Sequence, residues 1–421
     1  MNGNDLMTQT PAPAPKNPFR PGNGQRPLYL AGRTHEQDQF KKMVNETTVA
    51  QNMILTGLRG TGKTVLLEEL KPIAQTNGWL WTGNDLSESA SLTEAKIAQR
   101  LVVDLSALLS PIMVQKQEKH PVGFTGKTEA HERPLEFNDL WKIYESTPGL
   151  IDDKLKAVFT NVQNILEQTS FKGVIFAYDE AQNLSDHALS KEYPLSLLLD
   201  VFSFFQRKQS KARFMLVLTG LPTLFPKLNE ARTYTERMFH TMQLQRLDDI
   251  AAREAITKPI ELTNSTMTFS EDTIRKIIEM SNGYPYFIQF ICKEVFDAWI
   301  GKITVGQAAS VPMKDILDKL DLDFFAPRWA RATDRQQDFM RVIAKLSNAD
   351  DEFSVQDIVA ASRRILKRGF TPSHATQILQ ALGEKGLVYR NRRAGYCFAV
   401  PLLSKFITRQ KWDESSLPDL T

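Results

Sequence analysis

The chain has 421 residues, of which 42% are hydrophobic and 24% charged, and its formal net charge is +3. This length predicts two or three domains, and the composition is that of an ordinary globular protein. No window holds the roughly 20 apolar residues of a membrane span, and the chain does not begin with an apolar signal-peptide core, so we expect no membrane partner. The two cysteines, Cys292 and Cys397, lie far apart without a metal-ligand spacing, and we expect a reducing, cytoplasmic setting.

Residues 1–27 are rich in Pro, Gly, Asn and Gln and predict a flexible tail. From about Leu28 short apolar runs alternate with helical patterns. The predicted strands are Met53–Leu55, Gly78–Trp81, Val174–Tyr178 and Phe214–Leu218, and the predicted helices are Val65–Leu70, Leu92–Leu109 and Ile151–Gln168. Nearly all-apolar strands separated by helices are typical of a parallel sheet covered on both faces, so the fold class is α/β.

Residues 110–150 carry several prolines and glycines and little periodicity, and predict an insertion of loops and short helices. From about residue 246 strand patterns stop. Helical patterns follow at Asp248–Ile256, Glu271–Met280, Tyr286–Phe296 and Met313–Leu320. The predicted order is therefore a core over 28–245, a helical domain over 246–330 and a further compact domain over 331–411, with a tail over 412–421.

The segment Gly57–Thr64 matches the phosphate-loop pattern GxxxxGK[ST] and lies between a predicted strand and a predicted helix. Its glycines allow backbone N–H groups to converge on phosphate oxygens, and the helix that follows adds its positive N-terminal end. Lys63 is expected to reach the β- and γ-phosphates, and the Thr64 hydroxyl to coordinate Mg²⁺. The residues expected to bind the nucleotide are Gly57, Leu58, Arg59, Gly60, Thr61, Gly62, Lys63, Thr64 and Val65. The similar run Gly126-Lys127-Thr128 is rejected, because Pro121 stands where the pattern needs glycine and no strand precedes it.

Asp179 and Glu180 directly follow the apolar run Val174–Tyr178. This places both carboxylates at the carboxyl edge of the sheet, where ligands bind in open α/β folds. The pair resembles a Walker B motif, which implies that Asp179 holds Mg²⁺ and that Glu180 orients and polarises the attacking water. The alternative is an acidic surface turn.

The phosphate loop and the acidic pair resemble those of the AAA+ superfamily of ATPases, particularly its initiator-like and STAND-like branches, over about residues 28–300. The resemblance implies ATP and Mg²⁺ as cofactors, and the preference for adenine rests on it alone. Four weaker features agree with it. They are Arg33 in a GRxxE-like box that such families place near adenine, Thr219 at the polar first-sensor position, Arg237 where related ATPases carry an arginine finger, and Pro285 in the GxP turn Gly283-Tyr284-Pro285. The resemblance implies that Arg33 and Pro285 also belong to the nucleotide-binding residues.

Each weaker feature has an ordinary structural alternative. Arg33 could cap a helix or pair with an acid, Thr219 could simply end a strand, and Arg232 competes with Arg237 as the finger. An arginine finger acts from a neighbouring subunit in this superfamily, so Arg237 in that role implies an oligomer. The chain departs from the family where many members carry a second-sensor arginine, because Gly283–Tyr286 holds none.

Residues 331–411 read as helix, helix, helix and hairpin, which resembles the winged-helix domain that follows the lid of initiator-like ATPases. The helices are predicted over Gln336–Lys345, Ser354–Ala361 and from Thr371–Pro372 to about Gly386, with Ser354 and Thr371 as N-caps. Leu387–Arg390 and Tyr396–Val400 flank the turn 391–395.

This C-terminal domain is basic. Residues 331–411 contain 15 Lys and Arg against 7 Asp and Glu, a net charge of +8 in a chain whose total is +3. Arg363, Arg364, Lys367 and Arg368 precede the third helix, and Arg390, Arg392 and Arg393 lie in the predicted wing. Such a distribution suits contacts with DNA phosphates. Winged helices also serve as protein-binding or packing modules, which is the alternative.

The sequence thus favours an ATP-hydrolysing nucleotide-dependent switch or motor that self-associates and acts on double-stranded DNA through residues 331–411. The proposed catalytic residues are Glu180, Lys63, Thr219 and Arg237, with Thr64 and Asp179 as metal ligands. The alternative is a STAND-like signalling ATPase that engages a protein partner. The basic domain favours the first hypothesis, whereas Gly283-Tyr284-Pro285 and the missing second-sensor arginine favour the second.

Overall fold

A computed structural model describes residues 16–22, 24–46, 48–87, 93–119, 128–208, 213–263, 265, 267–304, 312–390 and 395–410. The chain divides into two compact units. One holds residues 33–245 and 346–400, and the other holds the residues up to Gly32, Arg246–Lys345 and those from Pro401.

The first unit is built on a parallel five-stranded sheet in the order β2-β5-β6-β1-β7. Its strands are β1 (Asn52–Gly57), β2 (Trp79–Thr82), β5 (Gly173–Tyr178), β6 (Phe214–Gly220) and β7 (Phe239–Leu244). The predicted parallel α/β sheet is thereby confirmed. The edge strand β7 was not predicted, because its sequence FHTMQL mixes buried, half-buried and exposed positions instead of forming an apolar run.

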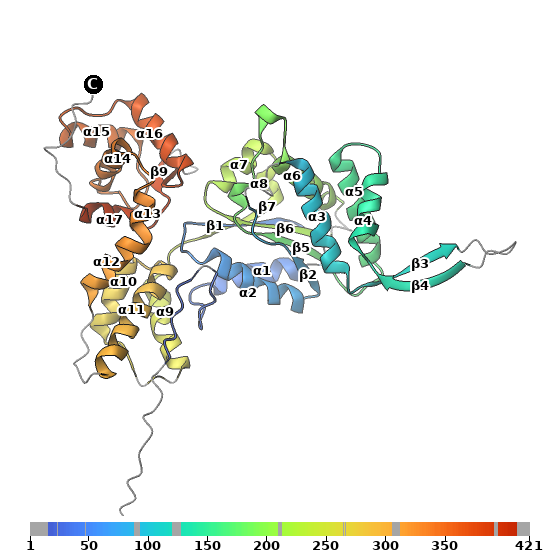
Figure 1. The fold of residues 1–421 in the computed structure, drawn as a ribbon, viewed down its shortest axis with the longest axis horizontal. Coiled ribbons are helices and arrows are strands. Elements are labelled where there is room, and N and C mark those ends of the chain that lie inside the picture. The colour runs from blue at the N-terminus through green and yellow to red at the C-terminus, as the bar shows by residue number, and fades with distance from the viewer. Residues whose placement is uncertain are drawn as a thin grey trace, which may run out of the picture. The chain divides into compact units, whose positions relative to one another are not determined.

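Helices cover both faces of this sheet (Figure 1). Those of the first unit's core are α1 (Thr34–Asn45), α2 (Lys63–Thr76), α3 (Glu94–Leu109), α4 (Phe137–Ser146), α5 (Ile151–Leu166), α6 (Pro194–Gln206), α7 (Leu224–Ala231) and α8 (Thr235–Met238). Figure 1 shows α1 and α2 on one face and α3, α5 and α6 on the other. The second face is filled by aromatic rings, with Phe159 stacked on Phe176 at a centroid distance of 5.4 Å and touching Phe202, Phe205 and Phe214. Because strands β1, β5 and β6 are buried along their whole length, the sheet is a rigid platform for the loops at its edge.

The insertion differs from its prediction of loops and short helices. Strands β3 (Met113–Lys119) and β4 (Thr128–Pro134) pair in antiparallel register, and α4 follows with ten residues. Figure 1 shows this hairpin projecting from the core beside α4. The strands are rich in Gln, Lys and Glu, and so lack the apolar alternation by which strands are recognised.

The second unit is helical. It contains α9 (Asp249–Leu262), α10 (Glu271–Ser281), α11 (Pro285–Thr304), α12 (Met313–Leu320), the π-helix Asp321–Phe325, α13 (Ala326–Trp329), α14 (Asp334–Ala344) and α17 (Leu403–Arg409). The four helices predicted between residues 248 and 320 are all present, and α11 is longer than expected. None of the helices in the described part of the chain has the length and apolar character needed to cross a membrane.

Part of the predicted tail packs against these helices. Phe19 is only 2% exposed and stacks on Phe269 at 6.0 Å, with Phe296 edge-on at 6.3 Å. The Asn17 amide donates to the Lys293 carbonyl at 2.9 Å and to the Asp297 carboxylate at 2.7 Å. A single aromatic anchor in a Pro-rich stretch does not register in composition, so the expectation of a uniformly flexible segment over 1–27 missed it.

The remaining elements of the C-terminal region are α15 (Val355–Ile365), α16 (Pro372–Glu384), β8 (Val388–Arg390) and β9 (Tyr396–Phe398). Together with α14 they follow the predicted order of three helices and a hairpin. Both predicted N-caps are present, since the side chains of Ser354 and Thr371 accept hydrogen bonds from the amides of Asp357 and His374. Four residues of the predicted wing, 391–394, lie outside the described residues. The division of the chain into domains, including a winged helix over 331–411, stays a prediction.

Candidate functional site

The candidate site lies at the carboxyl edge of the parallel sheet. Strand β6 pairs with β1 on one side, Leu55 opposite Thr219, and with β5 on the other, Tyr178 opposite Leu218. The loop after β1, the acidic pair after β5 and the end of β6 therefore open at one edge, as expected for parallel strands.

The predicted phosphate loop is a tight turn that needs its glycines. Gly60 and Gly62 have positive φ angles of 79° and 88°, which side chains disfavour. A Cβ on Gly57 would lie 2.8 Å from the Leu244 carbonyl oxygen. Helix α2 begins at Lys63, directly after the loop, so its free N-terminal amides face this turn. The loop has the form of an anion-binding turn.

Lys63 is folded into the loop. Its Nζ donates to the carbonyl oxygens of Gly57 and Leu58, both at 3.0 Å, and the residue is 8% exposed. Burial lowers the pKa of Lys63 to about 8, although Asp179 and Glu180 oppose this shift. Backbone carbonyls are weak partners for a buried ammonium, so phosphate oxygens at this position would be better ones.

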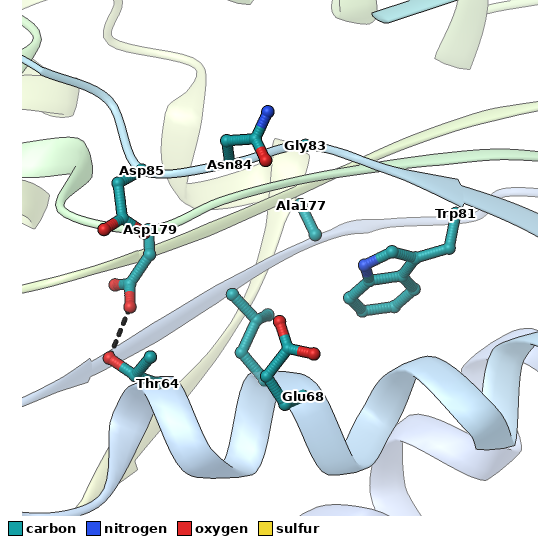
Figure 2. A pocket seen from close by; sticks show the side chains of 9 residues that line it. Thr64, Glu68, Trp81, Gly83, Asn84, Asp85, Ala177 and Asp179 are labelled. Atoms are coloured by element: carbon teal, nitrogen blue, oxygen red, sulfur yellow. Dashed lines mark hydrogen bonds between the residues drawn. The ribbon is translucent and has the colours of Figure 1, made fainter. Parts of the chain in front are cut away.

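Asp179 meets the loop across the sheet edge. The Thr64 hydroxyl donates to Asp179 Oδ2 at 2.5 Å, drawn as the dashed line in Figure 2, and the Glu180 amide donates to Oδ1 at 2.8 Å. Asp179 is 4% exposed, and burial raises the pKa of its carboxyl group. A hydroxyl and a carboxylate in contact are oxygen donors of the kind Mg²⁺ takes. Among the described residues there is no group of three or more His, Cys, Asp or Glu that could hold a metal ion.

A cavity of about 370 Å³ adjoins this pair (Figure 2). It is lined by Thr64, Leu67, Glu68, Trp81, Gly83, Asn84, Asp85, Ala177 and Asp179. Figure 2 shows Glu68 entering from α2 and Asp85 from the segment after β2. The sequence analysis found only Thr64 and Asp179 among these residues, because the segment after β2 has no recognised motif. One signal could have found them, because the residues after the predicted strand Gly78–Trp81 belong to the same carboxyl edge of a parallel sheet.

Glu180 sits in the left-handed region, with φ 51°. Its carboxylate accepts a hydrogen bond from the Gln182 side-chain amide. The carbonyl oxygen of that same Gln182 amide accepts from the Leu221 backbone amide at 3.0 Å, directly after β6. Gln182 thus links the acidic pair to the end of β6, a role that sequence reasoning missed.

Thr219 lies inside β6, fully buried. Its hydroxyl has no hydrogen-bond partner within the described residues. A buried polar group without a partner is costly, and structures retain few of them. This fits the first-sensor role that the resemblance implies for Thr219, which stays a prediction.

A second buried hydrogen-bond network holds Tyr178, the residue directly before Asp179. The Tyr178 hydroxyl donates to Asp104 Oδ2 at 2.8 Å, and Arg100 on the same helix, α3, binds both oxygens of that carboxylate at 3.0 Å. On the other side the Asp179 amide donates to the Asn84 carbonyl oxygen at 3.3 Å. The residues around Asp179 are therefore held by α3 and by the segment after β2.

Arg33 is also at the loop, but it contacts backbone. The guanidinium donates to the carbonyl oxygens of Thr61 at 3.0 Å and Gln245 at 2.8 Å and lies 3.5 Å from Glu36. It is 5% exposed, and burial lowers the pKa of its guanidinium while Glu36 raises it. Of the structural alternative for Arg33, the pair with an acid is present. Arg33 stands at the N-cap position of α1, but its side chain makes no capping hydrogen bond within the described residues.

The two candidate arginine fingers differ. Arg232 binds both carboxylate oxygens of Asp200, at 2.8 and 2.5 Å, and the Ser196 hydroxyl at 2.7 Å. Arg237, in α8, is exposed and makes no side-chain hydrogen bond or ion pair within the described part of the chain. The guanidinium of Arg232 is therefore paired within its own unit, whereas that of Arg237 is exposed to solvent.

Pro285 begins α11 in the helical unit. Before it, Gly283 has φ 73°, and a Cβ there would lie 2.4 Å from the Leu247 carbonyl oxygen. The Leu247 amide donates to the Gly283 carbonyl at 2.9 Å. The turn is thus a close packing point inside this unit, and the expected contact of Pro285 with nucleotide stays a prediction.

The C-terminal elements present an exposed basic and polar surface. Arg363, Arg364, Lys367 and Arg368 are all exposed at the end of α15 and just after it. On α16 the residues Ser373, Thr376, Gln377 and Gln380 are exposed, whereas Ala375, Ile378, Leu379 and Leu382 are buried. Helix α16 thus has a buried apolar face and an exposed polar face.

Residues 322–407 match a family model described as a domain of unknown function (DUF8462). A search of curated protein sequences found no significant relative. Among solved structures, the ADP form of the ORC2 protein of Aeropyrum pernix matches with a TM-score of 0.51 and 12% identity, over 92% of this chain and 96% of that one. The same protein solved as ADPNP–ADP complexes matches with a TM-score of 0.50 at 12% identity and the same coverage. At this identity the likeness establishes a shared fold.

The buried ammonium of Lys63 predicts a pH-dependent contribution to stability. Its pKa is about 8 in the folded chain and near 10.5 when unfolded, so between these values the unfolded state binds more protons and stability rises with pH. We expect wild-type protein to gain stability relative to Lys63→Met as pH rises from about 8 to 10.5. Urea unfolding of both proteins across this range measures the difference, with Lys71→Met on the same helix as reference. A difference that does not change with pH would contradict the buried, charged Lys63.

Proposed function

We propose that this protein is an ATP-binding and ATP-hydrolysing switch or motor of the AAA+ initiator-like type. The observation that carries the proposal is the contact between Thr64 and Asp179, which joins a glycine-rich anion-binding turn to a buried carboxylate. Turn, helix N-terminus, lysine and carboxylate at one sheet edge are the parts that phosphoryl transfer requires. The fold shared with an ORC2 protein solved with ADP and with ADPNP supports an adenine nucleotide as the ligand.

In this proposal the chain's own groups bind and orient the nucleotide. The amides of the turn and of the first residues of α2 bind phosphate oxygens, and Lys63 exchanges the Gly57 and Leu58 carbonyls for them. Thr64 and Asp179 would hold Mg²⁺, which neutralises developing charge on the phosphates. Glu180, held by Gln182, orients the attacking water and accepts its proton, and the free hydroxyl of Thr219 donates to the γ-phosphate or to that water.

Phosphate release by the purified chain, with ATP and Mg²⁺, tests the activity. Lys63→Ala should abolish turnover through loss of nucleotide affinity. Glu180→Gln should still bind nucleotide but turn over at least about 100-fold more slowly, the contribution expected of a general base. Glu46→Gln, an exposed carboxylate beyond α1, should behave as wild type. Turnover that survives both site variants would contradict the proposal.

We further propose that the active form is a self-assembly in which Arg237 completes the site of a neighbouring subunit. Its exposure and lack of partners within the described residues support this choice over Arg232, whose charge is neutralised by Asp200. A cation supplied from outside would stabilise transition-state charge that Lys63 alone does not cover.

Subunit mixing tests this assembly. Arg237→Ala keeps its own nucleotide-binding residues, and Glu180→Gln keeps its finger, so each alone should be nearly inactive. A mixture of the two should regain a measurable fraction of wild-type turnover. Arg237→Ala alone, at the same total protein concentration, should not. An Arg237→Ala protein with wild-type turnover would rule out the finger.

The exposed basic residues at the end of α15 and just after it, the polar face of α16 and the hairpin β8–β9 support a winged helix that contacts double-stranded DNA phosphates. Arg392 and Arg393 of the proposed wing lie outside the described residues. The alternative, a STAND-like switch with a protein partner, shares the nucleotide site and differs in having no DNA contact.

DNA binding measured at several salt concentrations separates these alternatives. The triple variant Arg363→Ala, Arg364→Ala, Lys367→Ala should bind more weakly, and its salt slope should fall by about 1 for each DNA phosphate that it no longer neutralises. The pair Lys41→Ala, Lys42→Ala, exposed on α1, is the control for the reduced positive charge. Turnover without DNA binding at low salt would favour the STAND-like switch.

A further inference from the structure

The observed contacts of Arg33 differ from those that the family resemblance implies. The resemblance places this residue near adenine. In the structure its buried guanidinium donates to the Thr61 carbonyl of the phosphate loop at 3.0 Å and to the Gln245 carbonyl at 2.8 Å. Its remaining edge faces Glu36. At 5% exposure the residue has little surface left for a base.

The bond to Thr61 has a consequence for the amide that follows. The structure has no cis peptide bond among its described residues, and in a trans peptide the C=O and the next N–H point in opposite directions. Because Arg33 holds the Thr61 carbonyl, the Gly62 N–H is fixed on the side away from Arg33. Gly62, with φ 88°, is the last residue before α2, where loop amides converge on an anion.

The second bond joins Arg33 to the far end of the same chain segment. Gln245 is the last residue of the segment 33–245, which lies within one compact unit together with the phosphate loop. The Gln245 carbonyl follows β7, so the loop is also braced against the edge of the sheet.

We propose that Arg33 is a positioning residue that orients the phosphate loop and so sets the affinity for the triphosphate group, independent of the base. The inference rests on the nucleotide site proposed above and assigns Arg33 a different role from adenine contact. A buried guanidinium that donates to carbonyls at 2.8 and 3.0 Å holds the loop in its binding conformation before the ligand arrives. Such prearrangement raises affinity by removing an ordering cost from binding.

The experiment compares ATP, GTP and inorganic tripolyphosphate, each titrated against wild type, Arg33→Gln and Arg33→Lys by calorimetry. We expect Arg33→Gln to weaken all the ligands that wild type binds by a similar factor, about tenfold, as for other residues that orient a ligand-binding group. The ratio of ATP to tripolyphosphate affinity should stay that of wild type. Arg33→Lys keeps the charge and one hydrogen-bond donor direction, so its affinity for each ligand should lie between those of wild type and Arg33→Gln.

Arg213 provides a matched control. Its guanidinium also donates to two backbone carbonyls, those of Phe171 and Lys172, both at 3.1 Å, at the opposite end of the sheet. Arg213→Gln removes the same kind of hydrogen bond and should leave all phosphate affinities unchanged. Melting curves without ligand show that each variant is folded.

The outcomes separate the possibilities. Weaker ATP binding with unchanged tripolyphosphate binding would overturn the inference in favour of a base contact. Equal reductions in affinity in Arg33→Gln and Arg213→Gln would overturn it in favour of general destabilisation. If Arg33→Gln does not fold, unchanged affinities in Arg33→Lys would likewise overturn it. A wild-type chain that binds none of the ligands would instead contradict the proposed nucleotide site itself.

Discussion

Strand β6 lies hydrogen-bonded between β1 and β5, and the contact between Thr64 and Asp179 depends on that arrangement. Thr64 and Asp179 are separated by 115 residues in the chain, yet their side chains are in contact. The contact exists because three buried, parallel strands end at the same edge, with β6 holding the other two one strand apart. The Gln182 bridge from Glu180 to Leu221 uses the same strand order.

The site contains several buried charges, and each has polar partners supplied by rigid elements. Asp179 is satisfied by a hydroxyl and an amide, Asp104 by Tyr178 and Arg100, and Arg33 by two carbonyls. Lys63 differs, because its partners are neutral loop carbonyls, and an anion would be a stronger partner for its ammonium group. Desolvation of these groups is costly, so the stability of the sheet and its helices has to offset the cost of burying them.

Sequence patterns located the central elements because their signals are local. The apolar runs of β1, β5 and β6 and the glycine-rich turn before α2 are each readable within a few residues. The hairpin β3–β4 and the edge strand β7 were missed, since the sequences of β3 and β4 are rich in polar residues and β7, which is only partly buried, has no continuous apolar run. Phe19 was missed for a related reason, because one buried ring in a Pro-rich segment depends on a partner surface far along the chain, at Phe269 and Phe296.

By itself the sequence determined the parallel α/β core, the glycine-rich turn before α2 and the acidic pair after β5, since short-range spacing and hydrophobicity specify these. The tertiary structure decided which side chains meet. It brought Thr64 into contact with Asp179. It also placed Gln182, Asn84 and Asp85, which lie in segments without motifs, at the same site. It distinguished Arg232 from Arg237, because Arg232 pairs with the carboxylate of Asp200. It also set Arg33 against backbone carbonyls. Such contacts depend on how strands are ordered in the sheet and on what each side chain finds there, and neither is encoded in local spacing.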